Sequence, residues 1–151
     1  MVLFGKDAVL YWSSTLLNGT SVTADTATWV EQENVADLTD TYTPTDVDIT
    51  TRATAKTGWE ATATILKAGD ISFNMQVLHG DSFVDAIFTA FLNSTPIALM
   101  DLTAADTVDG AFGLAANFAV SLTQAKPVKG VQTVDVTLKV REYPEWVTIS
   151  V

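Results

Sequence analysis

One amphipathic helix constrains this chain more than any other feature, because most of the remaining sequence favours strands. Asp81 and Ser82 are residue types that favour a helix N-terminus, and Pro96 cannot continue a helix. The spacing of apolar residues predicts a helix over about residues 82–92. Its predicted packing face consists of Val84, Ile87, Phe88, Phe91 and Leu92. Burying each of these side chains is worth roughly 1.5–3 kcal/mol, so the helix needs an apolar sheet surface.

Alternating apolar and polar residues predict the strands that supply this surface. Ile71 to Val77 alternates regularly, and the apolar run 97–102 is typical of a strand covered on both faces. Strands are predicted over residues 8–17, in a second run after residue 19 that extends through 28–30, and over residues 47–55, 59–66, 71–77, 97–102, 111–123 and 133–141. Turns are predicted at 18–19, 68–70 and 125–130, and Tyr143 with Pro144 is expected to end the last strand.

The predicted fold class is mainly β: a β-sandwich or partly open barrel with one flanking α-helix. A long acidic loop is predicted over about residues 31–46, because this stretch is polar and rich in turn formers. Such a loop is expected to become ordered when a partner binds. A length of 151 residues fits a single domain over 1–151.

The charge of the chain argues against an electrostatic grip on nucleic acid. Eight basic and eighteen acidic residues give a net charge of −10, whereas affinity for phosphates comes mainly from Lys and Arg. Solubility alone explains an acidic surface. The acids are concentrated over 25–48, a stretch without Lys or Arg, and most basic residues come later. Self-association of opposed surfaces is favoured by such a split but not required by it.

No set of residues predicts an enzyme, a cofactor or a metal site. The chain has no cysteine, and His79 lies beside Asp81 and Ser82 in one turn, where the three cannot form a catalytic triad. The acidic stretch 31–48 lacks the spacing of a calcium loop. No phosphate-binding glycine loop is present, and we recognise no signal peptide and no apolar run long enough for a membrane span.

The order of these features resembles the major tail tube proteins of long-tailed bacteriophages, whose fold is shared with the type VI secretion tube protein. The resemblance covers roughly residues 28–141 and is clearest at its end. Three segments carry it: DVDITTRATAKTGWEATATIL, GDSFVDAIFTAFLNSTPIALMDL and FAVSLTQAKPVKGVQTVDVTLKV.

The resemblance implies a structural virion protein that self-assembles into stacked hexameric rings. These rings would form a tail tube, the conduit for DNA ejection. The implied partners are further copies of the chain, tail components such as the terminator and the tape measure protein, and genomic DNA that passes without specific binding. The protein would be made in the host bacterial cytoplasm and reside in the virion tail.

The resemblance also assigns roles to two sets of residues. The loop over 31–57 is expected to contact the neighbouring ring. The ring-stacking residues expected within it are Val35, Asp37, Leu38, Asp40, Tyr42 and Asp46. Ser72, Asn74 and Gln76, the polar face of an alternating strand, are expected to face the lumen. The sequence does not distinguish contractile from non-contractile tails, or a tail tube from a secretion tube.

A second function remains open at this stage: a monomeric β-sandwich module that binds carbohydrate or peptide. In that case an exposed aromatic residue, such as Trp59 or Trp146, would contact the ligand. An enzyme ranks last, because neither a nucleophile nor an acid pair is evident.

Overall fold

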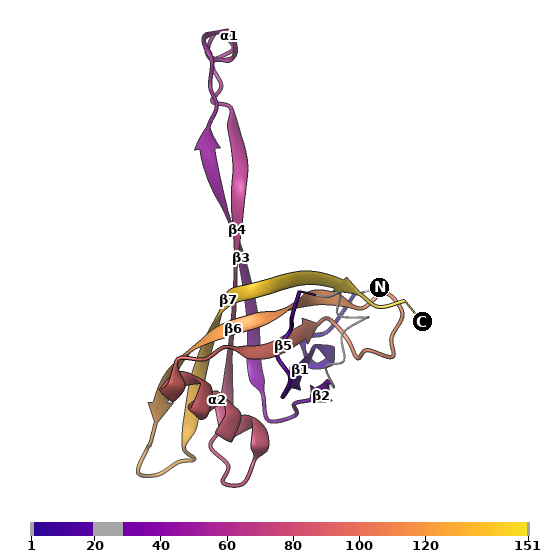
Figure 1. Cartoon of the computed structure of the whole chain (residues 1–151), viewed down its shortest axis with the longest axis vertical. Helices are drawn as coiled ribbons and strands as arrows, with labels where there is room; N and C mark the ends of the chain where they lie inside the picture. The colour runs from indigo at the N-terminus through magenta and orange to yellow at the C-terminus, as the bar shows by residue number, and fades with distance from the viewer. Residues whose placement is uncertain (1, 20–28, 151) are drawn as a thin grey trace.

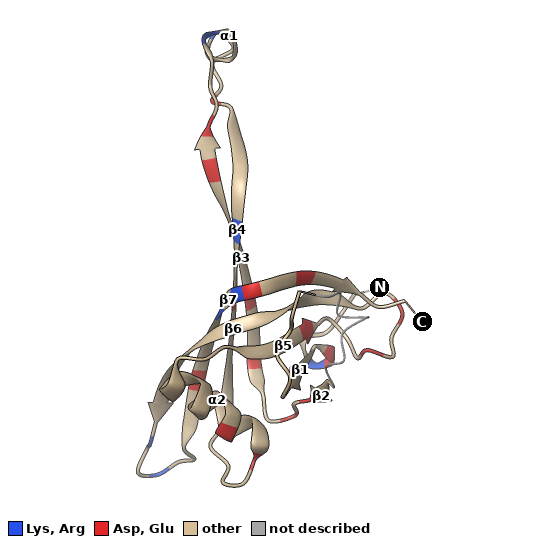
Figure 2. Ribbon diagram, in the orientation of Figure 1, with Lys and Arg blue, Asp and Glu red and all other residues tan. Residues whose placement is uncertain are grey.

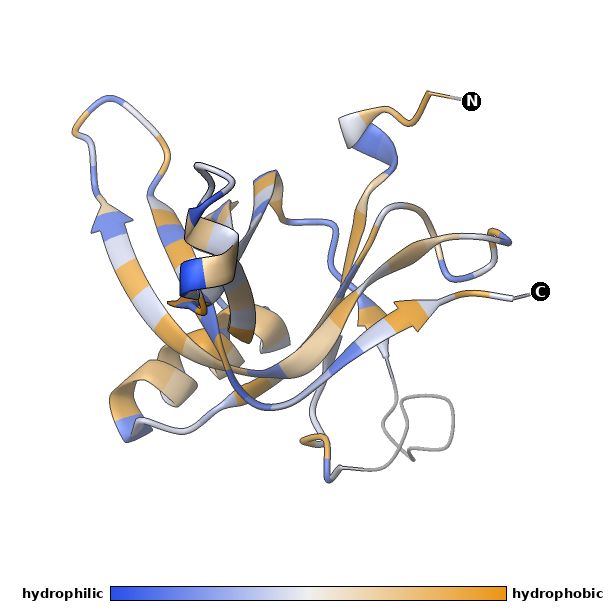
Figure 3. Ribbon diagram, turned by 90° about the horizontal axis from the view of Figure 1, so that it is seen from above, coloured by the Kyte–Doolittle hydropathy of each residue, from blue (hydrophilic) through white to orange (hydrophobic). Residues whose placement is uncertain are grey.

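The computed structural model describes residues 2–19 and 29–150, and these form a mainly β fold with one long helix against the sheet (Figure 1). The seven-stranded antiparallel sheet has the order β2-β1-β5-β6-β7-β4-β3 and does not close. Its strands are β1 (Val9–Ser13), β2 (Val30–Glu31), β3 (Ala36–Asp48), β4 (Thr62–Gln76), β5 (Ile97–Leu102), β6 (Phe112–Ala125) and β7 (Thr133–Thr148). The helices are η1 (Gly5–Asp7), α1 (Arg52–Ala55) and α2 (Ser82–Asn93). The predicted mainly β fold class with a flanking helix is therefore confirmed, and its strands form one curled, open sheet (Figure 3).

Helix α2 lies where the sequence predicts it. Asp81 caps its first turn, because Oδ1 of Asp81 accepts a hydrogen bond from the Phe83 N–H at 2.9 Å. Ser94 ends the helix in the left-handed conformation, with φ of 55°. No helix of the described ranges is long and apolar enough to cross a membrane.

The packing face of α2 differs from the predicted one. Val84 and Ile87 are buried, but Phe83 and Ala90 complete the buried face. The assignment of Phe91 and Leu92 to this face is wrong, since they are 48% and 77% exposed. Phe88 is partly buried. The contact face is rotated because the Phe83 ring packs against Phe73, at 6.1 Å between ring centroids, and against Trp12, at 5.8 Å.

Two apolar clusters occupy opposite faces of the sheet. The larger cluster joins α2 to inward side chains of the long strands, including Phe73, Phe118 and Val136. The smaller cluster lies on the face of β1, β5 and β6 that points away from α2, and it includes Met100. Strand β5 is buried along its whole length, as its apolar run predicts. The alternation that places these clusters is visible along the strands in Figure 3.

The acidic loop predicted over residues 31–46 is wrong for most of its length. Strand β3 begins at Ala36, so only residues 32–35 separate it from β2. Most side chains of β3 are exposed on both faces, and the strand therefore lacks the alternation that identifies a half-buried strand.

Three smaller predictions also need correction. Residues 52–55 form α1 instead of strand, and β4 continues through the turn predicted at 68–70. Gly69 serves close packing: a Cβ there would lie 3.1 Å from Cδ2 of Leu114 and 3.2 Å from Cγ2 of Val140. Strand β7 continues through Tyr143 and Pro144, because register shifts against β6 accommodate them. The turn predicted at 18–19 leads into a run that lies mostly outside the described residues.

Candidate assembly surface

The most prominent feature outside the core is a projecting hairpin, which we call the arm and define as residues 43–68. It comprises the outer part of β3, the helix α1 and the outer part of β4, and it extends far beyond the sheet body (Figure 1). Strand β4 pairs with β7 only from Asp70 to Gln76. Residues 62–69 of β4 therefore pair with β3 alone, as a two-stranded ribbon.

Local hydrogen bonds shape the tip of the arm. The Ile49 N–H donates to the Ala61 carbonyl at 2.8 Å, and the Ala61 N–H donates to Oγ1 of Thr50 at 2.9 Å. Thr51 and Thr54 form a reciprocal capping box that begins α1. These bonds give the tip a defined turn without any contribution from a hydrophobic core.

The arm carries apolar side chains that the chain itself leaves uncovered. None of residues 43–68, all of which are described, is buried. Its exposed large apolar side chains are Val47, Ile49, Trp59, Ile65 and Leu66, with Trp59 79% exposed. An isolated two-stranded hairpin is marginally stable in water, and clustered exposed apolar groups typically mark a protein contact. The arm is therefore a candidate surface for contact with another molecule.

The charge of the arm differs from that of the body. The arm holds three basic residues, Arg52, Lys56 and Lys67, and three acidic ones, Asp46, Asp48 and Glu60. Its formal charge cancels, so the net charge of −10 belongs to the rest of the chain. Two of the basic residues lie at the tip (Figure 2). A neutral arm with a basic tip is not repelled by the acidic body of another copy.

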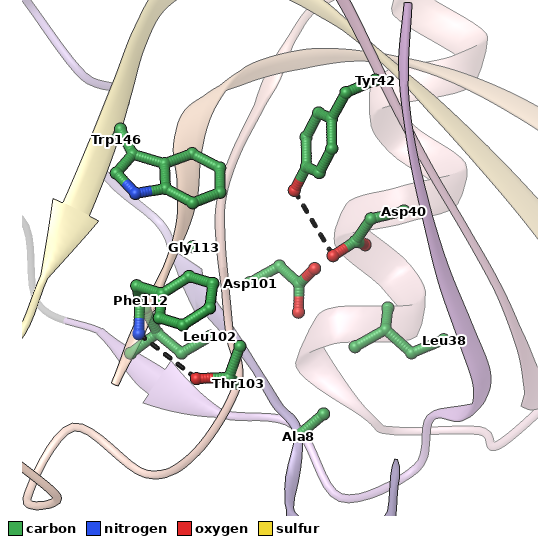
Figure 4. Close-up of a pocket in the computed structure, with 10 residues that line it drawn as sticks. All are labelled: Ala8, Leu38, Asp40, Tyr42, Asp101, Leu102, Thr103, Phe112, Gly113 and Trp146. Atoms are coloured by element: carbon green, nitrogen blue, oxygen red, sulfur yellow. Dashed lines mark hydrogen bonds between the residues drawn. The ribbon is translucent and has the colours of Figure 1, made fainter. Parts of the chain in front are cut away.

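A pair of carboxyl groups marks the root of the arm (Figure 4). Asp101 lies in β5 and is 3% exposed, and its carboxyl points toward that of Asp40 on β3. Burial raises the pKa of Asp101 to about 9, with further contributions from the hydrogen bond with Asp40 and from its charge. The Asp101 carboxyl is therefore protonated at neutral pH. The Tyr42 hydroxyl donates to Oδ2 of Asp40 at 3.4 Å, and burial raises the pKa of Tyr42 further above its usual value.

Aromatic side chains surround this pair on the body side. The Trp146 ring lies 5.8 Å from Tyr42, edge to face, and 5.8 Å from Phe112, nearly stacked, measured between centroids. A cavity of about 150 Å³ separates Trp146 and Phe112 from Asp40 and Asp101. A wider hollow of about 950 Å³ runs along the arm root from Thr64 to Trp146.

The structure divides the predicted ring-stacking residues between body and arm. Val35 and Leu38 pack against the larger cluster, so they anchor β3 to the body. Asp37 has a φ of 54° at the start of β3. Asp40 and Tyr42 meet at the root of the arm. Only Asp46 lies in the arm itself, where its Oδ1 accepts a hydrogen bond from Oγ1 of Thr64 at 2.8 Å.

The three predicted lumen residues share one face of β4. Their neighbours Ile71, Phe73 and Met75 point into the core, so Ser72, Asn74 and Gln76 point to the opposite face. Nδ2 of Asn74 donates to Oδ1 of Asp135 on β7 at 2.6 Å, and Ser72 pairs with Thr137. The polar face thus extends across β4 and β7.

Sequence reasoning missed the arm and Asp101. Asp101 is the one charged residue in the apolar run 97–102, and a lone acid in a strand covered on both faces is a signal that could have identified it. Within the part of the chain that the structure describes, no group of three or more His, Cys, Asp or Glu residues is placed to hold a metal.

Solved structures with the same fold come from gene transfer agent particles and from a tail tube. One is a chain from the tail of an empty gene transfer agent particle, refined with helical C6 symmetry. It has a TM-score of 0.72 and 12% identity, and the match covers 97% of this chain and 100% of that one. A chain from the virion of a native gene transfer agent particle matches with a TM-score of 0.71 and 11% identity, over 97% of this chain and 100% of that one.

A third similar structure is the SPP1 tail tube, with a TM-score of 0.66 and 14% identity. That match covers 99% of this chain and 81% of the other. No protein-family model and no curated protein matches the sequence. At these identities the likeness shows the fold, and this chain has the fold of the major tail tube proteins.

Proposed function

We propose that this chain is the structural subunit of a phage-type tail tube, assembled from stacked hexameric rings around a channel for DNA. The arm is the observation that carries this proposal, because it is a long projection with no net charge whose apolar side chains have no cover in the isolated chain. The shared fold supports it, and the tail of one similar structure was refined with C6 symmetry. The subunit acts by assembly and not by catalysis.

In the proposed tube, the arm of one copy packs on a neighbouring copy. Burying each apolar side chain of the arm is worth roughly 1.5–3 kcal/mol, which offsets the entropy of fixing the ribbon. The hollow beside Trp146 offers an aromatic surface of suitable size for such a contact. Asp46 and the arm tip take part in ring stacking, whereas Val35 and Leu38 hold the base of the arm in place.

Assembly also covers the two exposed edges of the open sheet. Strands β2 and β3 form its two edges, and β3 exposes most of its length. Exposed edges invite uncontrolled pairing, and closure of sheets into a ring removes them. In this arrangement Ser72, Asn74 and Gln76 face the lumen. A polar surface on a chain with net charge −10 lets DNA slide without binding.

The remaining elements of the proposal concern the setting of the tube. The protein is made in the cytoplasm of a bacterial host and resides in the virion tail. Its partners beyond further copies are the tail components at the ends and in the channel of the tube, the terminator and the tape measure protein.

Assembly of the purified protein tests the function directly. In a shortened-arm variant, Asn-Gly replaces residues 47–63 and closes the ribbon at the Asp46–Thr64 pair with a two-residue turn. We expect rings or tubes from the unaltered chain, by light scattering and negative-stain microscopy, and only folded monomers from this variant. The double substitution I65D/L66D tests the same contact without a change in length.

Val128→Asp is the matched control, because Val128 is fully exposed in the turn between β6 and β7, remote from the arm. It should assemble normally. Assembly of the shortened-arm variant to the same extent as the unaltered chain would refute the role of the arm.

The lumen assignment has a separate test. Tubes of the double variant S72K/Q76K should retain DNA in co-sedimentation, because the added lysines attract phosphates. Tubes of T89K, changed on the exposed side of α2, should retain no more DNA than unaltered tubes. Equal retention by both variants would mean that the face of Ser72 and Gln76 does not line the channel.

One observation favours the alternative of a monomeric binding module. Trp146 is 55% exposed and lies beside the wide hollow, as a ligand-binding aromatic residue would. That function predicts a strict monomer at every concentration, with Trp146 fluorescence quenched by an oligosaccharide or a peptide. Loss of the quenching in Trp146→Phe would then locate the ligand.

A further inference from the structure

The root of the arm contains a buried carboxyl oxygen that has no hydrogen-bond partner among the described residues. Oδ2 of Asp101 is buried and accepts no hydrogen bond from the described residues. The residue is 3% exposed and lies in a strand covered on both faces. Native proteins rarely leave such an oxygen without a partner, because its desolvation is costly. An unpartnered oxygen that lines a cavity points to a ligand.

The cavity in front of Asp101 has the chemistry of a cation site. Asp40 supplies a second carboxyl group beside that of Asp101, and Tyr42 and Thr103, which carry hydroxyl groups, also line the cavity. The ten residues that line the cavity include no Lys, Arg or His to neutralise the pair. Its volume of about 150 Å³ is several times what one water molecule requires.

We propose that Asp40 and Asp101 bind one hard divalent cation, Ca²⁺ or Mg²⁺, between the root of the arm and the sheet body. Such ions prefer oxygen ligands, and a site with one or two carboxylates keeps several waters on the metal. The ion takes the place of the proton that Asp101 holds in the metal-free chain, and this proton is released to solvent. The cavity leaves room for those waters. With so few charged ligands, we expect a dissociation constant of about 10⁻⁴–10⁻³ M.

The position of the pair gives the ion a structural role. Asp40 lies on the edge strand β3, and Asp101 lies on β5, with β6, β7 and β4 between them in the sheet order. The two carboxyl groups therefore meet across the open side of the curled sheet and not along a strand pair. A bound ion links these strands directly, so it fixes the base from which the arm projects.

Terbium luminescence tests the site on the isolated, unassembled chain of 151 residues. Tb³⁺ replaces Ca²⁺ at oxygen sites, and Trp146 lines the same cavity, close enough to sensitise its emission. We expect saturable emission that Ca²⁺ displaces. Both D101N and D40N should weaken it by about tenfold or more, since each removes one ligand. Asp40 is exposed, so D40N keeps the test valid even if D101N perturbs folding.

Asp46→Asn is the matched control, because it removes the same charge from the same strand but outside the cavity. It should retain the full emission. In a second measurement, Ca²⁺ should raise the thermal unfolding midpoint of the unaltered chain, of D46N and of W146F. The midpoints of D40N and D101N should not respond. W146F should also lose the emission, which would locate the ion beside that ring.

Equal emission and equal Ca²⁺ response in D46N, D40N and D101N would overturn the proposal. So would emission that Ca²⁺ does not displace, because Tb³⁺ would then be bound loosely to the acidic surface. A carboxyl pair that holds only a shared proton would produce neither signal. The assay requires no assembly, so its failure would leave the tail tube function intact, and failure to form tubes would leave the cation site intact.

Discussion

Asp101 is a residue whose ionisation is coupled to folding. Its pKa is about 9 in the folded chain, against 3.8 when solvated, because of burial and the neighbouring Asp40. Between these values the folded state binds one more proton than the unfolded state. The contribution of Asp101 to stability is therefore fully present below about pH 4 and is lost as pH rises toward about 9.

Asp101→Asn should remove this dependence in the metal-free protein. The free energy of unfolding of the unaltered chain should fall relative to that of the variant by up to about 1.4 kcal/mol per pH unit. Urea unfolding between about pH 5 and 9, with a chelator present, measures the difference. D46N should show the slope of the unaltered chain. A difference between the unaltered chain and D101N that stays constant with pH would show that Asp101 titrates normally.

Gly113 is a second residue on which the arm root depends. It pairs with Leu102 in the β5–β6 ladder, and a Cβ at this position would collide with the backbone carbonyl of Asp101. Backbone cannot move aside as a flexible side chain can. Gly113→Ala should therefore lower the free energy of unfolding by about 1–3 kcal/mol or more, measured by urea unfolding. Gly5→Ala is the control, because no atom lies within 4 Å of its added Cβ, and it should change little.

At the scale of elements, helix α2 carries two apolar side chains of its predicted packing face that differ sharply in burial. Ile87 is 0% exposed and Leu92 is 77% exposed. Ile87→Ala leaves a cavity under the helix and should cost about 2–5 kcal/mol. Leu92→Ala should change the unfolding free energy by no more than about 0.5 kcal/mol. Thermal or urea unfolding of the two variants measures both changes. Similar losses of unfolding free energy would mean that α2 packs on its predicted face.

The elements differ in how far sequence predicts them. The bounds of α2 follow from a cap and a helical period, both local signals, and the strand of Ile71 and Phe73 follows from alternation. The rotation of α2 depends on Phe73, whose contact with Phe83 no local pattern contains. Strand β3 was taken for a loop because its outer part faces solvent on both sides.

The candidate site was predicted only in part, because it too depends on contacts between residues that are distant in the sequence. Asp40, Tyr42 and Asp46 were singled out on a supposed loop and lie on a strand, where two of them meet at the arm root. Their partner Asp101 lies far away in the sequence, and only the curl of the sheet brings it close. Gly69 predicts a turn from sequence, whereas in the structure it lies within β4, close to the side chains of Leu114 and Val140.

At the scale of the whole molecule, the chain consists of a packed body and an arm that contributes nothing to the core. Stability is not uniform in such a molecule, because local opening requires little free energy where few buried contacts are lost. The body is held by two apolar clusters, and residues 43–68 contain no buried side chain. We therefore expect the isolated arm to open, and to be cleaved by proteases, far more readily than the body.

Limited trypsin digestion should make this difference visible. Arg52 and Lys56 are exposed at the tip, whereas Lys139 lies in the middle of β7, paired on both sides. In the monomer, cleavage after Arg52 and Lys56 should precede cleavage after Lys139, because only the latter requires the body to unfold. In the proposed tubes a neighbouring copy covers the arm, so the two tip sites should become resistant on assembly. Mass spectrometry of timed samples identifies the order. Cleavage of the tip at the same rate in monomers and tubes would mean that neighbouring copies leave the arm exposed, and another surface would then have to hold the rings together.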